Sequence, residues 1–295
     1  MVKMKKDKNI FYTNIHGGLG NQMFQYAIGR SISLKRDVKL NLDLSKMGGY
    51  NLRSFSLGKF NIPEGLFIEN KSKINKSNKY FHWIAKKLQK MNISINEKFY
   101  EKNEFFFDEE IFSISKNSID GYWQSYKYFE DIRETLINEF TLKEDLNLKN
   151  KDVLKLINST NSVSIHIRRG DYLNVSKNKS IYNVFGMEYY QKAINYIKEN
   201  VENPCFFVFS DDINWCVENF TIDNVHYVDA NTTSNFECDM VLMSQCEHNI
   251  IANSTFSWWG AWLNNNENKE VVAPKKWINA LNNINDILPK NWIRL

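Results

Sequence analysis

The chain has 295 residues, 43% of them hydrophobic, which is enough to bury one large core or two smaller ones, and two domains are the expectation at this length. Its 38 basic and 34 acidic residues leave a net charge of only +4, which excludes a dedicated nucleic-acid binder and favours acidic small-molecule substrates. The four cysteines lack C-x-x-C spacing, so we expect free thiols in a reducing compartment. The apolar run after the basic N-terminus is too short for a signal or a membrane span, so we expect a cytoplasmic protein.

The first predicted elements form a β-α-β unit. Residues 10–15 and 38–43 have the pattern of strands, and residues 22–34 carry apolar side chains at helical spacing. Glycines between the first strand and the helix let the backbone approach a ligand, where free N–H groups favour anions or hydroxyl oxygens.

This glycine loop runs from Gly17 through Gly18 and Gly20 to Asn21 and Gln22. It lacks the third glycine of a dinucleotide fingerprint. A plain tight turn is the alternative interpretation, but an amide side chain at Asn21 or Gln22 could reach a bound hydroxyl group.

The stretch between the β-α-β unit and residue 152 has a weaker pattern. Residues 80–91 predict an amphipathic helix that either packs on the core or docks on an anionic membrane surface. Residues 118–125 predict a strand with Tyr122 and Trp123, which either stack on a sugar or belong to the core. Residues 128–140 predict a second amphipathic helix, and the polar stretch 141–152 marks the boundary between domains 1–150 and 151–295.

Strands and helices alternate in the second domain, which predicts a parallel sheet with helices on both faces. The expected strands are 163–167, 206–209, 225–228, 249–252 and 271–273, and the expected helices are 188–200, 213–219, 235–246 and 256–263. Ser234 and Glu237 have the spacing of a capping box for the third helix.

Polar residues follow three of these strands, at the edge where ligands of parallel sheets collect. They are Arg168-Arg169-Gly170-Asp171, Ser210-Asp211-Asp212 and Asn253-Ser254-Thr255. Two guanidinium groups at a strand end suit phosphate oxygens, although pairing with surface carboxylates is the alternative. No D-x-D triplet occurs in the sequence, which weighs against a nucleotide-sugar site built on a divalent metal.

The other polar residues near this edge leave two interpretations open. Asp211 and Asp212 could accept hydrogen bonds from a ribose or a base, or be surface turn acids. Ser254 and Thr255 could bind phosphate oxygens or only cap the following helix. His166 lies on the polar side of its strand and could contact a nucleotide or be a structural histidine.

Five segments span nearly the whole chain in this order: Gly17-Gly18-Leu19-Gly20-Asn21-Gln22-Met23-Phe24-Gln25-Tyr26-Ala27, Gly121-Tyr122-Trp123-Gln124-Ser125, His166-Ile167-Arg168-Arg169-Gly170-Asp171-Tyr172, Phe209-Ser210-Asp211-Asp212 and Asn253-Ser254-Thr255-Phe256-Ser257-Trp258-Trp259-Gly260-Ala261-Trp262-Leu263. Together they resemble the motifs of the α-1,2-fucosyltransferases of glycosyltransferase family 11. The third segment is also shared with α-1,6- and protein O-fucosyltransferases, whereas the first and last together are specific to family 11.

The resemblance implies an α/β, GT-B-like fold of two Rossmann-like domains, with the donor site in the C-terminal domain and a largely acceptor-side N-terminal domain. It implies a galactoside α-1,2-L-fucosyltransferase of surface glycan biosynthesis that transfers fucose from GDP-β-L-fucose, with inversion, to the 2-hydroxyl of a terminal β-galactoside. No metal and no cofactor beyond the donor substrate are implied.

The resemblance also implies roles for individual residues. Arg169 would stabilise the β-phosphate, supported by Arg168 and Asp171. The remaining donor-binding residues would be His166, Asp211, Asp212, Ser254, Thr255 and Phe256. Asn21 would lie near the acceptor or the fucose, and the acceptor side would comprise Gly18, Gly20, Asn21, Gln22, Tyr122 and Trp123.

The general base stays unassigned at this point. Asp171 is a candidate by chemistry, but two neighbouring arginines lower the pKa of a carboxylate and make it a weak base. We therefore expect Asp171 to organise the arginines. A fucosyltransferase of another linkage, a non-catalytic nucleotide-sugar or glycan-binding protein, and a nicotinamide oxidoreductase are the alternative functions.

Overall fold

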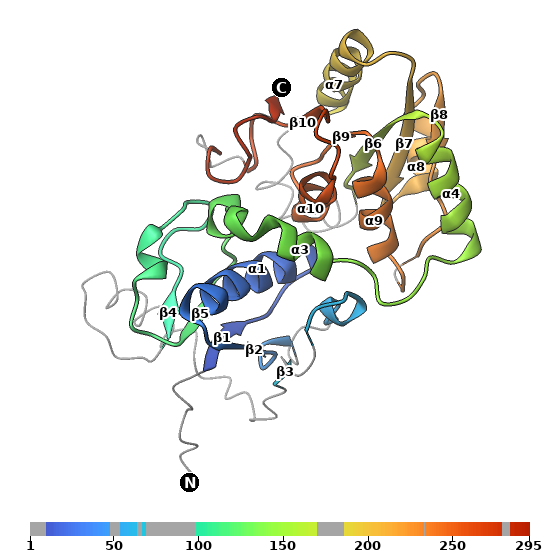
Figure 1. Ribbon diagram of the computed structural model, residues 1–295. Coiled ribbons are helices and arrows are strands. Elements are labelled where there is room, and N and C mark those ends of the chain that lie inside the picture. The colour runs from blue at the N-terminus through green and yellow to red at the C-terminus, as the bar shows by residue number, and fades with distance from the viewer. Residues whose placement is uncertain are drawn as a thin grey trace. The chain divides into compact units, whose positions relative to one another are not determined.

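The computed structural model describes residues 10–47, 54–63, 67–68, 98–169, 186–232, 234–278 and 284–295. The chain divides into two compact units, Met1–Lys143 and Glu144–Leu295. Each unit contains a parallel sheet with helices packed on it (Figure 1). This division precedes helix α4 (Leu148–Asn158), whereas the boundary after residue 150 that the sequence predicts lies within that helix.

The sheet of the first unit has the strand order β3-β2-β1-β5-β4. Its strands are β1 (Ile10–Asn14), β2 (Lys39–Asp43), β3 (Phe67–Ile68), β4 (Phe99–Tyr100) and β5 (Ser118–Asp120). The chain builds outward from β1 through β2 and β3 on one side, while β5 and β4 occupy the other side. The strand order therefore changes direction between β1 and β5. Open parallel sheets bind their ligands beside such a change of direction, here at the carboxyl ends of β1 and β5.

Helix α1 (Leu19–Arg36) packs on this sheet (Figure 1). Lys35 and Arg36 lie in its last turn, where positive charge interacts favourably with the helix dipole, and Asp37 ends it with a left-handed backbone. Helix α3 (Arg133–Glu139) is linked to α1 through Glu139, which accepts hydrogen bonds from the Tyr26 hydroxyl at 2.6 Å and from Arg30 Nε at 2.9 Å.

Two predicted elements of the first unit are shorter than expected. The helix predicted over 128–140 begins only at Arg133, because Phe129 has φ −150°, and the segment before it forms 3-10 turns at Tyr126–Tyr128 and Glu130–Ile132. The strand predicted over 118–125 ends at Asp120, and Trp123 has φ +58°. The helix predicted over 80–91 lies outside the described residues.

The sheet of the second unit has the order β11-β10-β9-β6-β7-β8. Its strands are β6 (Asn161–Ile167), β7 (Pro204–Ser210), β8 (Val225–Tyr227), β9 (His248–Ile250), β10 (Val271–Ala273) and β11 (Ile293–Arg294). The order reverses between β6 and β9, so their carboxyl ends form the corresponding ligand position of this unit.

Both faces of β6 are buried. Val163, Ile165 and Ile167 share a core with helices α7 (Met187–Asn200) and α8 (Ile213–Asn219). His166, on the opposite face, contacts helix α10 (Thr255–Leu263), which packs against α9 (Glu237–Gln245). The predicted capping box of α9 is wrong, because Phe236 is the N-cap residue and no side chain caps the helix.

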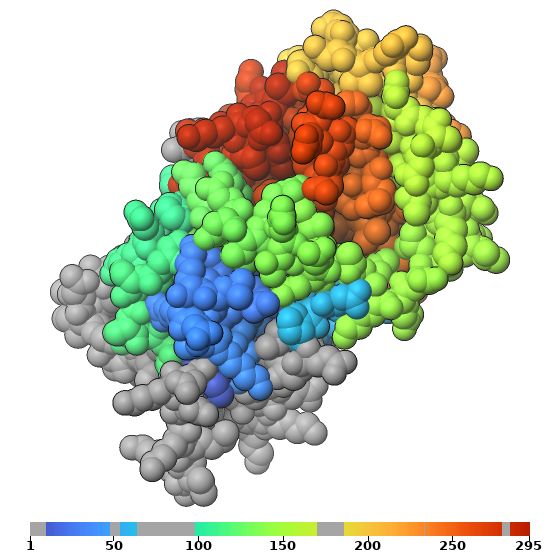
Figure 2. Space-filling view, in the orientation of Figure 1, coloured from blue at the N-terminus to red at the C-terminus, as the bar shows by residue number. Residues whose placement is uncertain are grey.

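Helix α4 lies at the surface of the second unit (Figure 2) and is connected to α9 by hydrogen bonds among the buried Asn150 and the half-buried Asn231 and Asp239. Asn150 exchanges hydrogen bonds of 2.8 Å with Asn231, which donates to Asp239 Oδ1 at 2.7 Å. Burial raises the pKa of Asp239 to about 6.

All four cysteines are free, as expected, and Cys205, Cys216 and Cys246 are buried. Among the helices in the described part of the chain, none is long and apolar enough to cross a membrane.

Candidate functional site

The carboxyl ends of β6 and β7 bring two arginines and two carboxylates together. Ile167 is in register with Ser210, so Arg168 and Arg169 leave one strand beside the residues that leave the other. Asp211 binds both arginines, since its Oδ2 lies 3.1 Å from Arg168 Nη1 and its Oδ1 accepts from Arg169 N–H at 2.9 Å.

Arg169 is held on two sides. Its Nε donates to Asp212 Oδ2 at 3.2 Å, and its guanidinium carbon lies 3.5 Å from the ring centroid of Trp215. Asp212 is also the N-cap of α8, and its Oδ1 accepts from Trp215 N–H at 3.4 Å. One carboxylate therefore fixes the helix, the ring and the arginine together.

Trp215 is not among the site residues expected from the sequence. A signal was present, because a residue three positions after a capping aspartate lies in the first helical turn, and helical side chains point back toward the N-terminus. An aromatic ring at that position reaches back toward the arginines at the strand end.

The segment Asn253-Ser254-Thr255, which follows β9, leads into the start of α10. The Ser254 hydroxyl accepts from Phe256 N–H at 3.3 Å and is the N-cap of the helix. The Phe256 ring lies 5.6 Å from the ring of His166, so β6 and the segment after β9 meet where the strand order reverses. Ser254, Thr255 and Phe256 are each half-buried, which leaves part of each side chain accessible to a ligand.

His166 is buried, with 3% of its surface exposed, and its backbone carbonyl accepts from the Tyr190 hydroxyl at 3.1 Å. Burial, followed by the charge of Arg168, lowers the pKa of the imidazole to about 4. Its Nδ1 makes no hydrogen bond to any described residue. A buried ring nitrogen without a partner has a free hydrogen-bonding position for a ligand. Gly170 and Asp171 lie outside the described residues.

The glycine loop of the first unit turns the chain from β1 into α1. Gly17 has φ +82°, a backbone conformation that side chains disfavour, and Gly18 is the N-cap residue without a capping side chain. Gly20 is buried in the first turn of α1. Asn21 is half-buried, and its Oδ1 accepts from Gln124 Nε2 at 3.1 Å.

Gln22 and Trp123, which the sequence also assigns to the acceptor side, lie in the interior of the first unit. Gln22 is fully buried, and its amide donates to the carbonyls of Gly17 and Ser54 at 2.9 Å each, so it connects two loops. The Trp123 ring is fully buried and packs against Phe99 at a centroid distance of 6.3 Å. Both residues belong to the core of the unit, and their assignment to the acceptor side stays a prediction.

Glu101 determines the backbone around Trp123. Its carboxylate accepts from Tyr122 N–H at 2.7 Å and from Trp123 N–H at 2.9 Å. A Cβ at Gly121 would lie 2.4 Å from Glu101 Cβ, so only glycine allows this approach. The result is that the Tyr122 side chain, unlike that of Trp123, is directed to the edge of the sheet.

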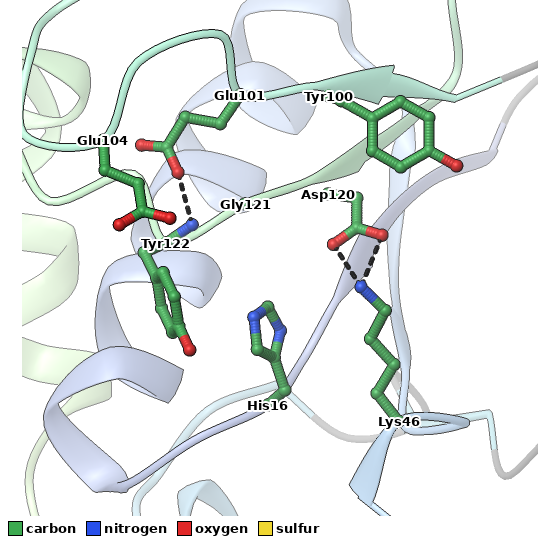
Figure 3. Close-up of a pocket in the computed structure, with 8 residues that line it drawn as sticks. All are labelled: His16, Lys46, Tyr100, Glu101, Glu104, Asp120, Gly121 and Tyr122. Carbon is green, nitrogen blue, oxygen red and sulfur yellow. Dashed lines mark hydrogen bonds and ion pairs between the residues drawn. The ribbon is translucent and has the colours of Figure 1, made fainter. Parts of the chain in front are cut away.

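A cavity of about 130 Å³ lies at this edge (Figure 3). It is lined by His16, Lys46, Tyr100, Glu101, Glu104, Asp120, Gly121 and Tyr122. Lys46 Nζ contacts both carboxylate oxygens of Asp120 at 2.6 Å, and the His16 and Tyr122 rings lie 4.7 Å apart. Burial, followed by the charge of Lys46, lowers the pKa of His16 to about 4.

Known structures share this architecture. Fucosyltransferase NodZ from Bradyrhizobium has a TM-score of 0.52 at 12% identity, covering 86% of this chain and 93% of that one. A mutant of Arabidopsis thaliana FUT1 in complex with GDP has a TM-score of 0.52 at 10% identity, covering 92% of this chain and 71% of that one. These similarities show the fold, which is GT-B-like with two Rossmann-like units, as the family resemblance implied.

Proteins related by sequence have a higher identity to this chain than these structures have. An α-1,2-colitosyltransferase of Escherichia coli is 39% identical over 90% of this chain and 91% of its own length, and the O-antigen biosynthesis glycosyltransferase WbnK of Escherichia coli is 36% identical over 90% and 94%. Galactoside α-(1,2)-fucosyltransferase 1 of Lagothrix lagotricha is 32% identical over 49% of this chain and 42% of its own. Residues 1–295 match the sequence pattern of glycosyl transferase family 11, and the chain therefore belongs to this family of glycosyltransferases.

Proposed function

We propose that this glycosyltransferase transfers L-fucose from GDP-β-L-fucose to the 2-hydroxyl of a terminal β-galactoside, with inversion and without a metal ion. The observation that carries the proposal is the arginine pair at the reversal of strand order in the second unit, within a chain of family 11. GDP leaves as a diphosphate anion, and a guanidinium at a fixed position stabilises the charge that develops on it.

Each group at this edge has a role in the proposal. Arg169 contacts the β-phosphate, and Arg168 supports it. Asp211 and Asp212 hold the two arginines, as their contacts in the structure suggest, rather than the guanosine. The N–H groups at the start of α10 and the hydroxyls of Ser254 and Thr255 donate hydrogen bonds to the remaining phosphate oxygens.

The nucleoside would lie against the rings of His166 and Phe256, where the unpartnered His166 Nδ1 can bond to it. Asn21, in the first unit, is assigned to the acceptor or the fucose. The general base for the acceptor hydroxyl is left open, with Asp171 still proposed as an organiser of the arginines.

A second donor sugar has support from one relative. Because an α-1,2-colitosyltransferase is 39% identical to this chain over nearly its whole length, transfer of colitose is the competing function. Colitose is L-fucose without the 3-hydroxyl group, so the two functions predict opposite preferences for activated fucose and activated colitose under the same conditions.

Arg169→Ala tests the mechanism. Wild type should release GDP from GDP-fucose in the presence of lactose, with NMR of the product showing an α-1,2 linkage and with turnover unchanged by a chelator. We expect kcat/KM to fall by about 100- to 1000-fold in Arg169→Ala, as for loss of a single charge-stabilising donor. Arg133→Ala in the first unit is the matched control and should keep its turnover. A folded Arg169→Ala enzyme with near-normal turnover would refute the mechanism, and an absence of turnover with any galactoside would refute the function.

A further inference from the structure

The cavity of the first unit differs in charge from the donor edge of the second unit, by which we mean the carboxyl ends of β6 and β7 with Arg168 and Arg169. One lysine faces three carboxylates among its lining residues, whereas the donor edge contains two arginines. A phosphate group would be repelled from the cavity, but the hydroxyl groups of a neutral sugar could donate to carboxylates and accept from other groups. The position, at the carboxyl ends of β1, β4 and β5, is that expected for a ligand of this sheet.

Gln25 determines how His16 can act in this cavity. The buried Gln25 side chain accepts the backbone N–H of His16 at 2.9 Å through Oε1 and donates to the Gly121 carbonyl at 3.2 Å through Nε2. A backbone N–H can only donate and a carbonyl can only accept, so these two contacts fix which end of the amide is oxygen and which is nitrogen.

The same Gln25 Nε2 lies 3.1 Å from His16 Nδ1. Because this amide nitrogen is a donor, Nδ1 must be the acceptor and cannot carry a proton. The neutral imidazole therefore carries its proton on Nε2, at the opposite side of the ring. His16 is thus a hydrogen-bond donor in the cavity, and its only basic nitrogen is already occupied.

The other lining groups complete a set suited to a sugar. Glu101 is engaged by the two backbone N–H groups that follow Gly121, and Asp120 is paired with Lys46. Glu104 is exposed and makes no hydrogen bond or ion pair to another residue within the described part of the chain. Figure 3 shows the His16 imidazole between the Tyr122 ring and the Lys46–Asp120 pair.

We propose that this cavity binds a neutral sugar ring of the acceptor, with His16 Nε2–H donating to a hydroxyl oxygen and Glu104 accepting from a hydroxyl group. Gln25 is a positioning residue, since it acts on the sugar through the tautomer of His16. The inference rests on the proposed function and excludes His16 as the general base.

The first test observes the tautomer directly. Nitrogen-15 NMR of the full-length protein with labelled histidines should show His16 protonated on Nε2 and without titration between pH 6 and 8. The signal is assigned by its loss in His16→Gln. In the presence of GDP, added lactose should shift the Nε2 resonance. A proton on Nδ1, or no response to saturating lactose, would overturn the inference.

Kinetics provide the second test. His16→Phe removes the donor and should raise KM for lactose about tenfold, the loss of roughly one hydrogen bond, with KM for GDP-fucose unchanged. His16→Gln offers an amide N–H near the position of Nε2 and should recover part of that loss. Gln25→Glu, which places an acceptor beside Nδ1, should move the proton of His16 to Nδ1 in the NMR spectrum and raise KM for lactose.

The controls separate the two proposals. GDP affinity, measured by calorimetry, should be the same in wild type and in all three variants. An unchanged KM for lactose in folded His16→Phe would refute the sugar site while the proposed function stands. If wild type shows no turnover, the proposed function fails, and the lactose titration by NMR still decides whether the cavity binds a sugar.

Discussion

Replacing Trp215 tests whether the ring beneath Arg169 contributes to donor binding. In Trp215→Leu the guanidinium keeps its ion pair with Asp212 but loses the aromatic face that lies 3.5 Å from its central carbon. The side chain is then held by one contact instead of two and can adopt other rotamers more easily, so GDP must bind a less ordered arginine.

The structure sets the size of this effect. Cation–π contacts contribute about 0.5–1 kcal/mol at exposed sites and about 2 kcal/mol when desolvated. The Arg169 side chain is 24% exposed, so we expect about 1–2 kcal/mol, which corresponds to a roughly 5- to 30-fold weaker affinity for GDP. Trp215→Phe keeps a smaller ring and should fall between wild type and Trp215→Leu.

Isothermal titration calorimetry with GDP measures the affinity, and thermal unfolding reports stability, because Trp215 also packs against the core of the second unit. Val217→Ala is the matched control. It shortens an exposed side chain on the same helix without touching Arg169, so GDP affinity should not change. Equal GDP affinity in wild type and in folded Trp215→Leu would refute this reasoning.

Three further changes test the fold. Glu139→Ala leaves the buried Tyr26 hydroxyl and the half-buried Arg30 guanidinium without their shared partner, and urea denaturation should show a free energy of unfolding lower by about 2–3 kcal/mol. Gly121→Ala forces a Cβ into Glu101, so the midpoint of thermal unfolding should fall; an unchanged midpoint would contradict the close approach. The pKa of Asp239 is about 6 when folded against a reference of 3.8, so its contribution to stability is complete below pH 4 and is lost as pH rises through 6. The free energy of unfolding of Asp239→Asn should equal that of wild type at pH 4 and exceed it by about 3 kcal/mol at pH 8. A difference in the free energy of unfolding that does not depend on pH would contradict the raised pKa.

The second unit was largely predictable because its buried strands are short apolar runs with polar residues after them. Phe206–Phe209 is such a run, and β7 extends it by only a few residues. Once two strands are parallel and in register, the residues that follow them must meet, which is why Arg168 and Asp211 could be expected close together. Helix α4 was missed because it buries few side chains, among them the polar Asn150, and so has little apolar periodicity.

The site in the first unit was less predictable, because its geometry depends on contacts between distant parts of the chain. Nothing in the local sequence distinguishes Tyr122, at the cavity, from the buried Trp123, since the difference arises from the Glu101 carboxylate. The same holds for His16 and Gln25, whose arrangement is completed by the carbonyl of Gly121.

The two units have one property that bears on how such enzymes diversify. Each is a single uninterrupted stretch of sequence, and the chain passes from one to the other once, between residues 143 and 144. A single recombination event at that junction would therefore join one existing unit to a different partner unit, without cutting any strand or helix. The arginine pair and its supporting helix would be inherited unchanged in such an exchange.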